Sequence, residues 1–328
     1  MGLFDSGGKS DREILDENNR ADHPSKYDIE AIVGTLDNDS DQIRHDASVL
    51  LNAAANEVPD QVAPHVGAVY ETIADPDQVG HAETLWNLLF VLHETVDPDS
   101  EAGANLVPAV LQYVGVTAEG VRTLVLAITR RVVTAREGAA AWLAREAPRD
   151  RIEGVAAALT AEEIVERDHA VAIMREVGTV DASVCVAFAD ELVARLAEDN
   201  DQIVFNAVAA VMGVADEQPE RILHATDDLL GVLRHHPEYD AQHMASISLA
   251  RIAQTEPERL VGHTDLFAEQ ASTSGDMVRV NACITLGYVA RADASAVAPH
   301  RDVLEDRARN DGSEEVREFA QKALNELG

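Results

Sequence analysis

The chain has 328 residues, of which 59 are acidic and 26 basic, so its formal net charge is −33. A field of this sign repels nucleic acid and anionic membrane surfaces, and we expect neither as a partner. Apolar residues make up 46 % of the sequence but aromatic residues only 4 %, so alanine, valine and leucine must fill the core. No apolar run approaches the roughly 18 residues of a membrane-spanning helix, and no apolar signal core is present.

Residues 1–25 are rich in Gly, Ser, Asp and Asn, and we expect a mobile N-terminal tail. From residue 26 onward, apolar residues recur at helical spacing in paired segments that are separated by short polar turns. The first helix of each pair is expected near residues 26–36, 59–73, 103–116, 138–159, 181–197, 219–233, 257–272 and 295–308. The second helix is expected near residues 41–55, 77–96, 118–135, 161–177, 199–215, 239–254, 276–291 and 313–327.

The second helices share a frame: an acidic residue, then an apolar residue, an alanine four residues later, and a large apolar residue after four more. Ala47 takes the alanine position in the first pair. The last five pairs hold it at intervals of 37 or 38 residues: Ala170, Ala207, Ala245, Ala282 and Ala320. A period this constant is typical of repeat arrays, in which each unit buries its apolar face on its neighbours. We therefore predict one continuous domain of eight helix pairs over residues 26–328.

The first helices share a histidine near their start. The recurring residues are His65, His224, His263 and His300. Stacked repeats hold equivalent positions roughly 10 Å apart, whereas zinc requires donors about 2 Å from the ion. We therefore expect histidines that begin or pack a helix, and no metal site along this row.

The repeat is stretched between Val125 and Ala170, so an irregular segment is expected near residues 132–160. Two short helical runs in this segment are separated at Pro148. Because proline disrupts a helix interior, the sequence predicts a broken or additional helix here.

The frame resembles HEAT repeats, whose second helix begins with Asp, followed after a short spacer by Val and Arg, and continues to an Ala and a Leu-Gly. The matching residues in the seventh pair are Asp276, Val278, Arg279, Ala282, Leu286 and Gly287. The resemblance covers about residues 26–327 and implies an all-α, right-handed solenoid of about eight HEAT-like (armadillo-like) helix pairs. The resemblance departs at Val79-Gly80 in the second pair and Ile203-Val204 in the fifth, and the fourth and sixth pairs are also expected to lack the arginine. The Asp–Arg ladder that braces neighbouring units in the family is therefore expected to be interrupted in the middle of the array.

The charged residues are also unusual in kind, because 30 Asp and 29 Glu stand against 23 Arg and only 3 Lys. This composition resembles the cytosolic proteins of extreme halophiles. The resemblance implies a cytoplasmic protein whose carboxylates hydrate the surface in molar salt, where a Debye length of about 3 Å removes most self-repulsion. Cys185 and Cys283 lie in apolar helical runs, and we expect buried free thiols in a reducing compartment.

The sequence holds no G-x-S-x-G, phosphate-binding loop, paired C-x-x-C or H-E-x-x-H motif. We therefore expect no enzyme, no catalytic residue, no cofactor and no metal. One alternative stays open, because His235, His236, Asp240 and His243 crowd a single turn. That turn would suit a transition metal, in a HEAT-like metal-dependent enzyme or a lyase-type accessory protein.

In HEAT arrays the second helices line the concave face, which by resemblance is the usual partner groove. If Ala282 and Leu286 are buried, Val280, Ile284 and Gly287 fall on the opposite side of the helix at 100° per residue. Transferring this register to all eight pairs gives 24 positions, of which only Asp168 and Glu318 are acidic. In so acidic a chain, this depletion predicts a surface that meets a partner.

We therefore predict a scaffold or adaptor that binds a protein partner along the concave face. The predicted contact residues are Leu85, Leu88, Arg130, Arg175, Phe205, Met212, Ile247, Val280 and Ile284. Three alternatives are that the superhelix buries these residues against itself, that the face associates with a second copy, and that the register is wrong in the second pair. There Trp86, Leu89 and Phe90 make the helix apolar all round.

Overall fold

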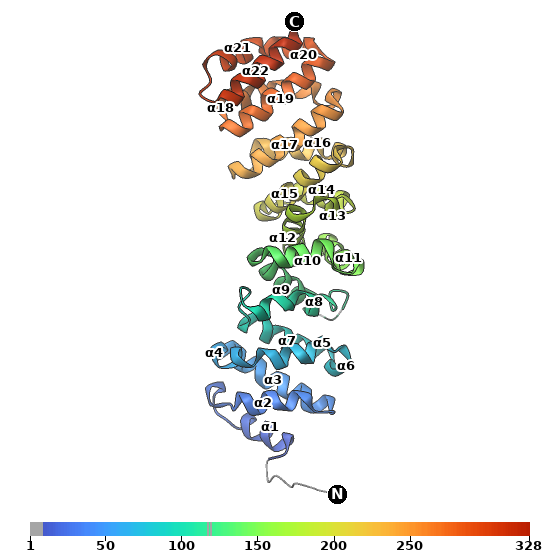
Figure 1. Ribbon diagram of the computed structural model, residues 1–328, viewed down its shortest axis with the longest axis vertical. Helices are drawn as coiled ribbons and strands as arrows, with labels where there is room; N and C mark the ends of the chain where they lie inside the picture. Colours follow the sequence, from blue (N-terminus) through green and yellow to red (C-terminus); the bar gives the residue numbers. More distant parts are fainter. Residues whose placement is uncertain (1–8, 117, 119) are drawn as a thin grey trace. The chain divides into compact units, whose positions relative to one another are not determined.

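The computed structural model describes residues 9–116, 118 and 120–328. Within these residues the chain forms α-helices and short 3-10 helices joined by turns, with no strand, and it is an all-α solenoid of paired helices (Figure 1). The contacts divide it into two compact units, one up to Ile173 and one from Met174 onward. The single continuous domain expected over residues 26–328 stays a prediction. None of the described helices is both long and apolar enough to cross a membrane.

The first unit stacks its second helices in sequence order, because α3 packs on α7 and α7 packs on α9. First helices α5 and α8 also contact each other and cover this layer on one side (Figure 1). The α-helices of this unit are α1 (Asp11–Asn19), α2 (Ile29–Gly34), α3 (Asp41–Glu57), α4 (Pro59–Val62), α5 (Val66–Ala74), α6 (Pro76–Val79), α7 (Ala82–Thr95), α8 (Glu101–Leu111), α9 (Val121–Ala135), α10 (Glu137–Arg145) and α11 (Arg149–Ala157), followed by α12 (Ile164–Val180), which runs into the second unit.

The second unit repeats this arrangement: α15, α17, α19 and α22 pack on one another in order, and α16, α18 and α21 each pack on the second helix of their own pair. Its α-helices are α13 (Ala182–Val186), α14 (Ala189–Val193), α15 (Asp201–Glu217), α16 (Thr226–His235), α17 (Tyr239–Thr255), α18 (Thr264–Thr273), α19 (Asp276–Ala292), α20 (Ala294–Val297), α21 (Arg301–Asn310) and α22 (Glu314–Leu327).

Short 3-10 helices lead into or end several first helices. They are η1 (Pro24–Lys26), η2 (Thr35–Asp37), η3 (Ala63–His65), η4 (Ala158–Thr160), η5 (Ala194–Ala197), η6 (Pro219–Ala225), η7 (Pro257–His263) and η8 (Ala298–His300). In η6 and η7 the proline stands at the first position, where its missing N–H would have no helical partner. Pro219 and Pro257 thus begin these first helices.

The repeating alanines lie in the core of their units. Their exposed fractions are between 0 and 2 %, for Ala47, Ala170, Ala207, Ala245, Ala282 and Ala320. Residues one, three, four, seven and eight positions after each alanine are buried as well in α3, α15, α17 and α19. A methyl group at the anchor lets neighbouring helices approach closely, and the anchor frame predicted from the sequence is confirmed.

The same burial pattern in α7 begins at Thr84, which is fully buried. The predicted register placed the anchor one residue earlier, so it is wrong in the second pair. The physical reason lies at Gly80, whose φ of 66° ends α6 and interrupts the expected helix over residues 77–96. Helix α7 therefore begins at Ala82, and its inward face is rotated by one residue relative to the expectation.

The prediction of a mobile tail over residues 1–25 is wrong for Asp11–Asn19, which form helix α1. Residues 1–8 lie outside the described part of the chain. Ser10 caps α1 through a capping box with Glu13, in which each residue satisfies a backbone N–H of the other. Leu15 is 2 % exposed, and Asn18 accepts a hydrogen bond from the Asp28 N–H at 2.7 Å. Caps and one apolar contact thus order a segment whose composition is that of a tail.

The break expected in the irregular segment near residues 132–160 is present. Helix α10 ends at Arg145, and Pro148 stands at the N-cap of α11. The first helix expected over 138–159 is therefore two short helices.

Candidate functional site

The candidate site is the outward side of the second helices. We define the second-helix face as the positions two residues before and two, five and six residues after each anchor, with Thr84 and Val125 as anchors in α7 and α9. In the first unit these residues are His45, Val49, Asn52, Ala53, Ala82, Trp86, Leu89, Phe90, Thr123, Ala127, Arg130, Arg131, Asp168 and Ala172. In the second unit they are Arg175, Glu176, Phe205, Ala209, Met212, Gly213, His243, Ile247, Ala250, Arg251, Val280, Ile284, Gly287, Tyr288, Glu318, Lys322, Asn325 and Glu326. All are partly or fully exposed except Leu89, Ala172, Ala250 and Val280.

The structure places six of the nine predicted contact residues on this face with part of their surface exposed. They are Arg130, Arg175, Phe205, Met212, Ile247 and Ile284. The other three are buried, since Leu85, Leu88 and Val280 are 3 %, 0 % and 6 % exposed. Leu85 and Leu88 belong to the core because of the register shift in α7. Val280 lies on the face by position but is buried, in a helix that packs on both α17 and α22.

Two aromatic residues that the predicted register missed, Trp86 and Phe90, lie on the face of α7. Their rings are stacked, with centroids 5.5 Å apart and planes 17° apart. Gly120, at the start of α9, has a φ of 74°, and a Cβ atom there would lie 2.8 Å from the Trp86 Nε1. Glycine is therefore required beside the indole ring. Gly80 was the signal in the sequence that could have placed these rings on the face, because a helix break there moves the register of α7 by one residue.

Arg130 and Arg175 are held by neighbouring side chains. In the first unit, Arg130 Nη1 lies 2.6 Å from Asp168 Oδ2 and 3.2 Å from His169 Nδ1. Burial lowers the pKa of His169 first, and the positive charge of Arg130 lowers it further, so this imidazole is neutral near pH 7. Arg130 is thus already paired with a carboxylate and held in place on the face.

In the second unit, Arg175 Nη1 donates to Asn206 Oδ1 at 2.8 Å, and its other nitrogens bond to Glu176. Its guanidinium carbon lies 5.8 Å from the centroid of the Phe205 ring, a distance at which cation–π attraction is significant. The Phe205 ring therefore has a charged neighbour on the face.

The second-helix face differs in charge from the rest of the molecule. Its 32 positions hold four acidic residues, Asp168, Glu176, Glu318 and Glu326, and five basic ones, so the face carries a formal charge of +1. The other 296 residues hold 55 acidic and 21 basic residues and carry −34. The net negative charge of this chain thus lies outside the second-helix face.

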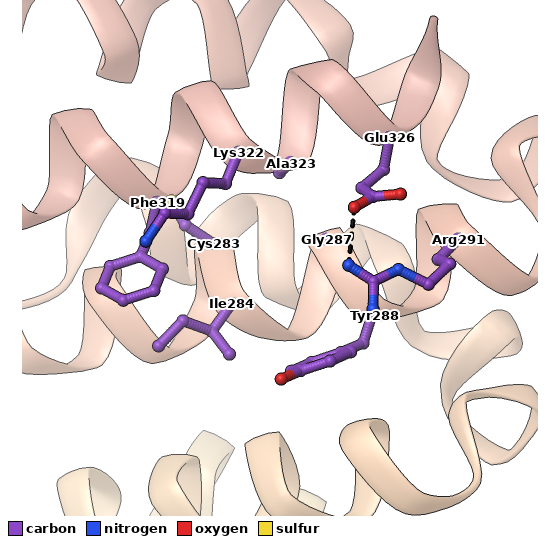
Figure 2. Close-up of a pocket in the computed structure, with 9 residues that line it drawn as sticks. All are labelled: Cys283, Ile284, Gly287, Tyr288, Arg291, Phe319, Lys322, Ala323 and Glu326. Carbon is purple, nitrogen blue, oxygen red and sulfur yellow. Dashed lines mark hydrogen bonds and ion pairs between the residues drawn. The ribbon is translucent and has the colours of Figure 1, made fainter.

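A cavity of about 110 Å³ opens on this face between α19 and α22 (Figure 2). It is lined by Cys283, Ile284, Gly287, Tyr288, Arg291, Phe319, Lys322, Ala323 and Glu326. Two cation–π pairs flank it: Lys322 Nζ lies 4.3 Å from the Phe319 ring centroid, and the Arg291 guanidinium lies 5.4 Å from that of Tyr288. We call this cavity the α19–α22 pocket.

The histidine turn does not assemble a metal site. Nε2 of His236 lies 3.1 Å from the Asp201 carbonyl oxygen, and its Nδ1 accepts from the Glu238 N–H at 3.1 Å, so both ring nitrogens are engaged by backbone. The ring of His243 instead stacks on Tyr239, with centroids 6.3 Å apart. Among residues 9–116, 118 and 120–328, no three His, Cys, Asp or Glu side chains converge on a point suited to a metal ion.

Two of the recurring histidines of the first helices lie close to carboxylates of the preceding repeat. His300 Nε2 lies 3.2 Å from Asp265 Oδ1, and His224 Nε2 lies 3.7 Å from Asp190 Oδ1. His65, His263 and His300 stand at the N-caps of α5, α18 and α21. Their position at helix starts agrees with the role expected from the sequence.

The arginine ladder extends further than predicted. Arg279 Nη1 donates to the Ser274 carbonyl oxygen at 2.7 Å, and Arg167 of the fourth pair, at the equivalent position, donates to the Ala161 and Glu162 carbonyl oxygens at 2.8 Å. The prediction that the fourth pair lacks this arginine is therefore wrong. In the sixth pair, Gln242 replaces it with a bond to the His236 carbonyl oxygen at 2.8 Å.

Solved structures show what the fold resembles. A chain from a study of the cadherin–beta-catenin interaction has a TM-score of 0.76 and 15 % identity, covering 90 % of this chain and 60 % of that one. An engineered protein has a TM-score of 0.62 and 15 % identity, covering 97 % and 99 %. A designed armadillo repeat protein in complex with the peptide (KR)4 has a TM-score of 0.55 and 15 % identity, covering 68 % and 99 %.

These likenesses establish an armadillo- or HEAT-like solenoid, and at such low identity they establish the fold alone. No protein-family model matches the sequence, and the search of curated proteins finds no match.

Proposed function

We propose that this chain is a non-enzymatic, cytoplasmic scaffold or adaptor that binds an extended segment of a partner protein along the second-helix face. The observation that carries the proposal is the segregation of charge: the face carries +1 while the remaining residues carry −34. A fully solvated surface of this protein would be expected to share its acidity. A face that carries no net negative charge does not repel an acidic partner segment as the rest of the molecule would, and it therefore suits contact with another chain.

The apolar side chains on the face supply the free energy that such contact needs. Phe205, Met212, Ile247 and Ile284 are partly exposed in the second unit, and Trp86 and Phe90 are partly exposed in the first. Completing the burial of one large apolar side chain contributes up to about 1.5–3 kcal/mol. A few such residues at the centre of an interface are enough to dominate binding.

The ordered arginines reduce the entropy lost on binding. Arg130 and Arg175 are already held by Asp168 and by Asn206, respectively, so a partner need not immobilise these long side chains. The designed armadillo protein in complex with (KR)4 offers a precedent for peptide binding on this fold. It supports the proposal by analogy of fold and does not identify a partner.

A peptide-display selection tests the proposal. Random 12-residue peptides would be selected on the immobilised full-length chain in about 1 M salt, where the Debye length is about 3 Å and non-specific attraction is screened. We expect a set of related sequences that compete with one another for the protein. If repeated selection enriches no sequence above an uncoated surface, the proposed function is wrong.

A further inference from the structure

The α19–α22 pocket exists because one side chain is missing from the repeat. Five residues after the anchor, the other second helices carry Asn52, Leu89, Arg130, Arg175, Met212, Ala250 and Asn325. In α19 this position is Gly287, and Ala323 of α22 lies opposite. A Cβ atom built on Gly287 would lie 3.5 Å from Ala323 Cα, which is ordinary van der Waals contact. The backbone would therefore accept a side chain at residue 287, and the glycine leaves that space empty.

The size of the pocket restricts its occupant. Its volume is about 110 Å³, whereas pockets for cofactors and drug-sized ligands span about 300–1,000 Å³. An apolar cavity of about 150 Å³ holds a benzene molecule. The α19–α22 pocket is therefore the size of a single side chain.

The lining restricts the chemistry of that side chain. Ile284, Phe319 and Tyr288 form apolar walls, and Figure 2 shows Ile284 and Tyr288 projecting from the same side of α19. Arg291 Nη2 is paired with Glu326 Oε1 at 2.6 Å, and Lys322 Nζ with Glu318 Oε1 at 2.6 Å. Each cation at the rim is thus neutralised by an adjacent carboxylate, and the rim offers no net charge to a ligand.

The floor is uncharged as well. Burial raises the pKa of the Cys283 thiol to about 12, and the negative charge of Asp311 adds to that effect. The thiol is therefore protonated at neutral pH and acts as one more apolar surface.

We propose that the α19–α22 pocket is an anchor site that takes one uncharged aliphatic or aromatic side chain of an extended partner segment. This inference rests on the proposed function, since it names the residue class that the second-helix face recognises. It differs from recognition of a basic segment such as (KR)4, because lysine and arginine find no unpaired carboxylate at this rim. The walls then enclose the side chain, while the rest of the segment lies along the face.

The selected peptides supply the first test. We expect the enriched sequences to share one large apolar residue at a fixed place, without a run of lysines or arginines. Enrichment of basic runs would overturn the anchor assignment while leaving the proposed function intact. Failure to enrich any sequence would instead count against the proposed function, so the two failures are distinguishable.

Two variants at Gly287 supply the second test, and both copy residues that equivalent helices already carry. Gly287→Ala copies Ala250 and narrows the pocket, whereas Gly287→Met copies Met212 and fills it. Affinity for a selected peptide, measured by fluorescence polarisation, should fall several-fold for Gly287→Ala and at least about 100-fold for Gly287→Met, which corresponds to about 2.7 kcal/mol.

The matched control is Gly231→Ala, a helical glycine of α16 whose Cβ would have nothing within 4 Å. It makes the same gain in helix propensity as Gly287→Ala and should bind the peptide as the parent does. Melting temperatures of all three variants establish that each is folded. If both Gly287 variants are folded and bind like the parent, the pocket is not the anchor.

Discussion

Two aspartates contact the same arginine from different environments. Arg279 Nη2 lies 2.9 Å from Asp311 Oδ1 and 2.9 Å from Asp276 Oδ1, but the Asp311 side chain is 1 % exposed and that of Asp276 is 68 % exposed. Burial by itself raises the pKa of Asp311, but hydrogen bonds from Arg279 and the Ser313 N–H outweigh it, and the pKa is lowered overall. The buried carboxylate therefore joins α19 to the turn before α22.

We expect Asp311→Ala to reduce the free energy of unfolding by about 3–5 kcal/mol, because it leaves a largely buried arginine without its main partner. The control Asp276→Ala removes an exposed partner of the same arginine and should cost less than about 1 kcal/mol. Urea unfolding at pH 7 measures both. Equal effects of the two substitutions would show that burial of Asp311 does not determine its contribution.

The pH dependence follows from the lowered pKa of Asp311. A carboxylate whose folded pKa lies below its unfolded value of about 3.9 stabilises the fold fully above that value, and the stabilisation is lost as the pH falls through the folded pKa. The difference in unfolding free energy between the parent and Asp311→Ala should therefore be constant near neutral pH. This difference in unfolding free energy should narrow below about pH 4. Urea unfolding curves of both proteins at several pH values measure it.

At the scale of the helix, the anchors set how closely neighbours approach. Ala207 and Ala282 are 0 % and 2 % exposed in the middle of α15 and α19. Ala207→Leu or Ala282→Leu should lower the free energy of unfolding by about 1–3 kcal/mol, because the added atoms overpack the contact. Ala209→Leu, two residues from an anchor but on the second-helix face, is the matched control and should change stability little. An anchor variant that melts like the control would show that the helices there are not closely packed.

The sequence predicted helices well where periodicity and a clear anchor agreed, as in α15, α17 and α19. The predicted register failed in α7, because that helix carries apolar residues on all sides and its inward face is set by the backbone conformation of Gly80. It also missed α1, although the capping pair Ser10 and Glu13 was a readable local signal. In α7 the helix was predicted but its register was wrong, and in α1 the tail-like composition concealed the helix.

The candidate site was partly predictable for a different reason. Positions such as Phe205 and Ile284 follow from helical spacing alone, and they do lie on the face. The partners of Arg130 could not be predicted, because Asp168 stands 38 residues away and is brought near only by stacking of the repeats. The α19–α22 pocket depends in the same way on Gly287 meeting Ala323 of the next helix.

At the scale of the whole molecule, the charge distribution predicts a dependence on salt. The residues outside the second-helix face carry −34, and their mutual repulsion is screened over a Debye length of about 3 Å at 1 M salt but about 10 Å at 0.1 M. We therefore expect helix content and melting temperature, measured by circular dichroism, to fall as salt is reduced from about 3 M to about 0.1 M.

Sucrose is the control for this salt series, because it favours compact states without screening charge. At low ionic strength, sucrose should not restore the helix content and melting temperature that salt maintains. An unchanged melting temperature across the series would contradict the interpretation that this is a protein adapted to high salt.

The central claim is that the second-helix face binds a partner while contributing little to the stability of the fold. The most direct measurement is the affinity of a selected peptide for the double variant Phe205→Asp/Ile284→Asp, read by fluorescence polarisation, with Met277→Asp as control. Met277 is 45 % exposed on the same helix as Ile284 but lies outside the face. We predict that the double variant melts within a few degrees of the parent and no longer binds the peptide. The control should melt and bind the peptide as the parent does. A folded double variant that still binds the peptide with the affinity of the parent would contradict the claim.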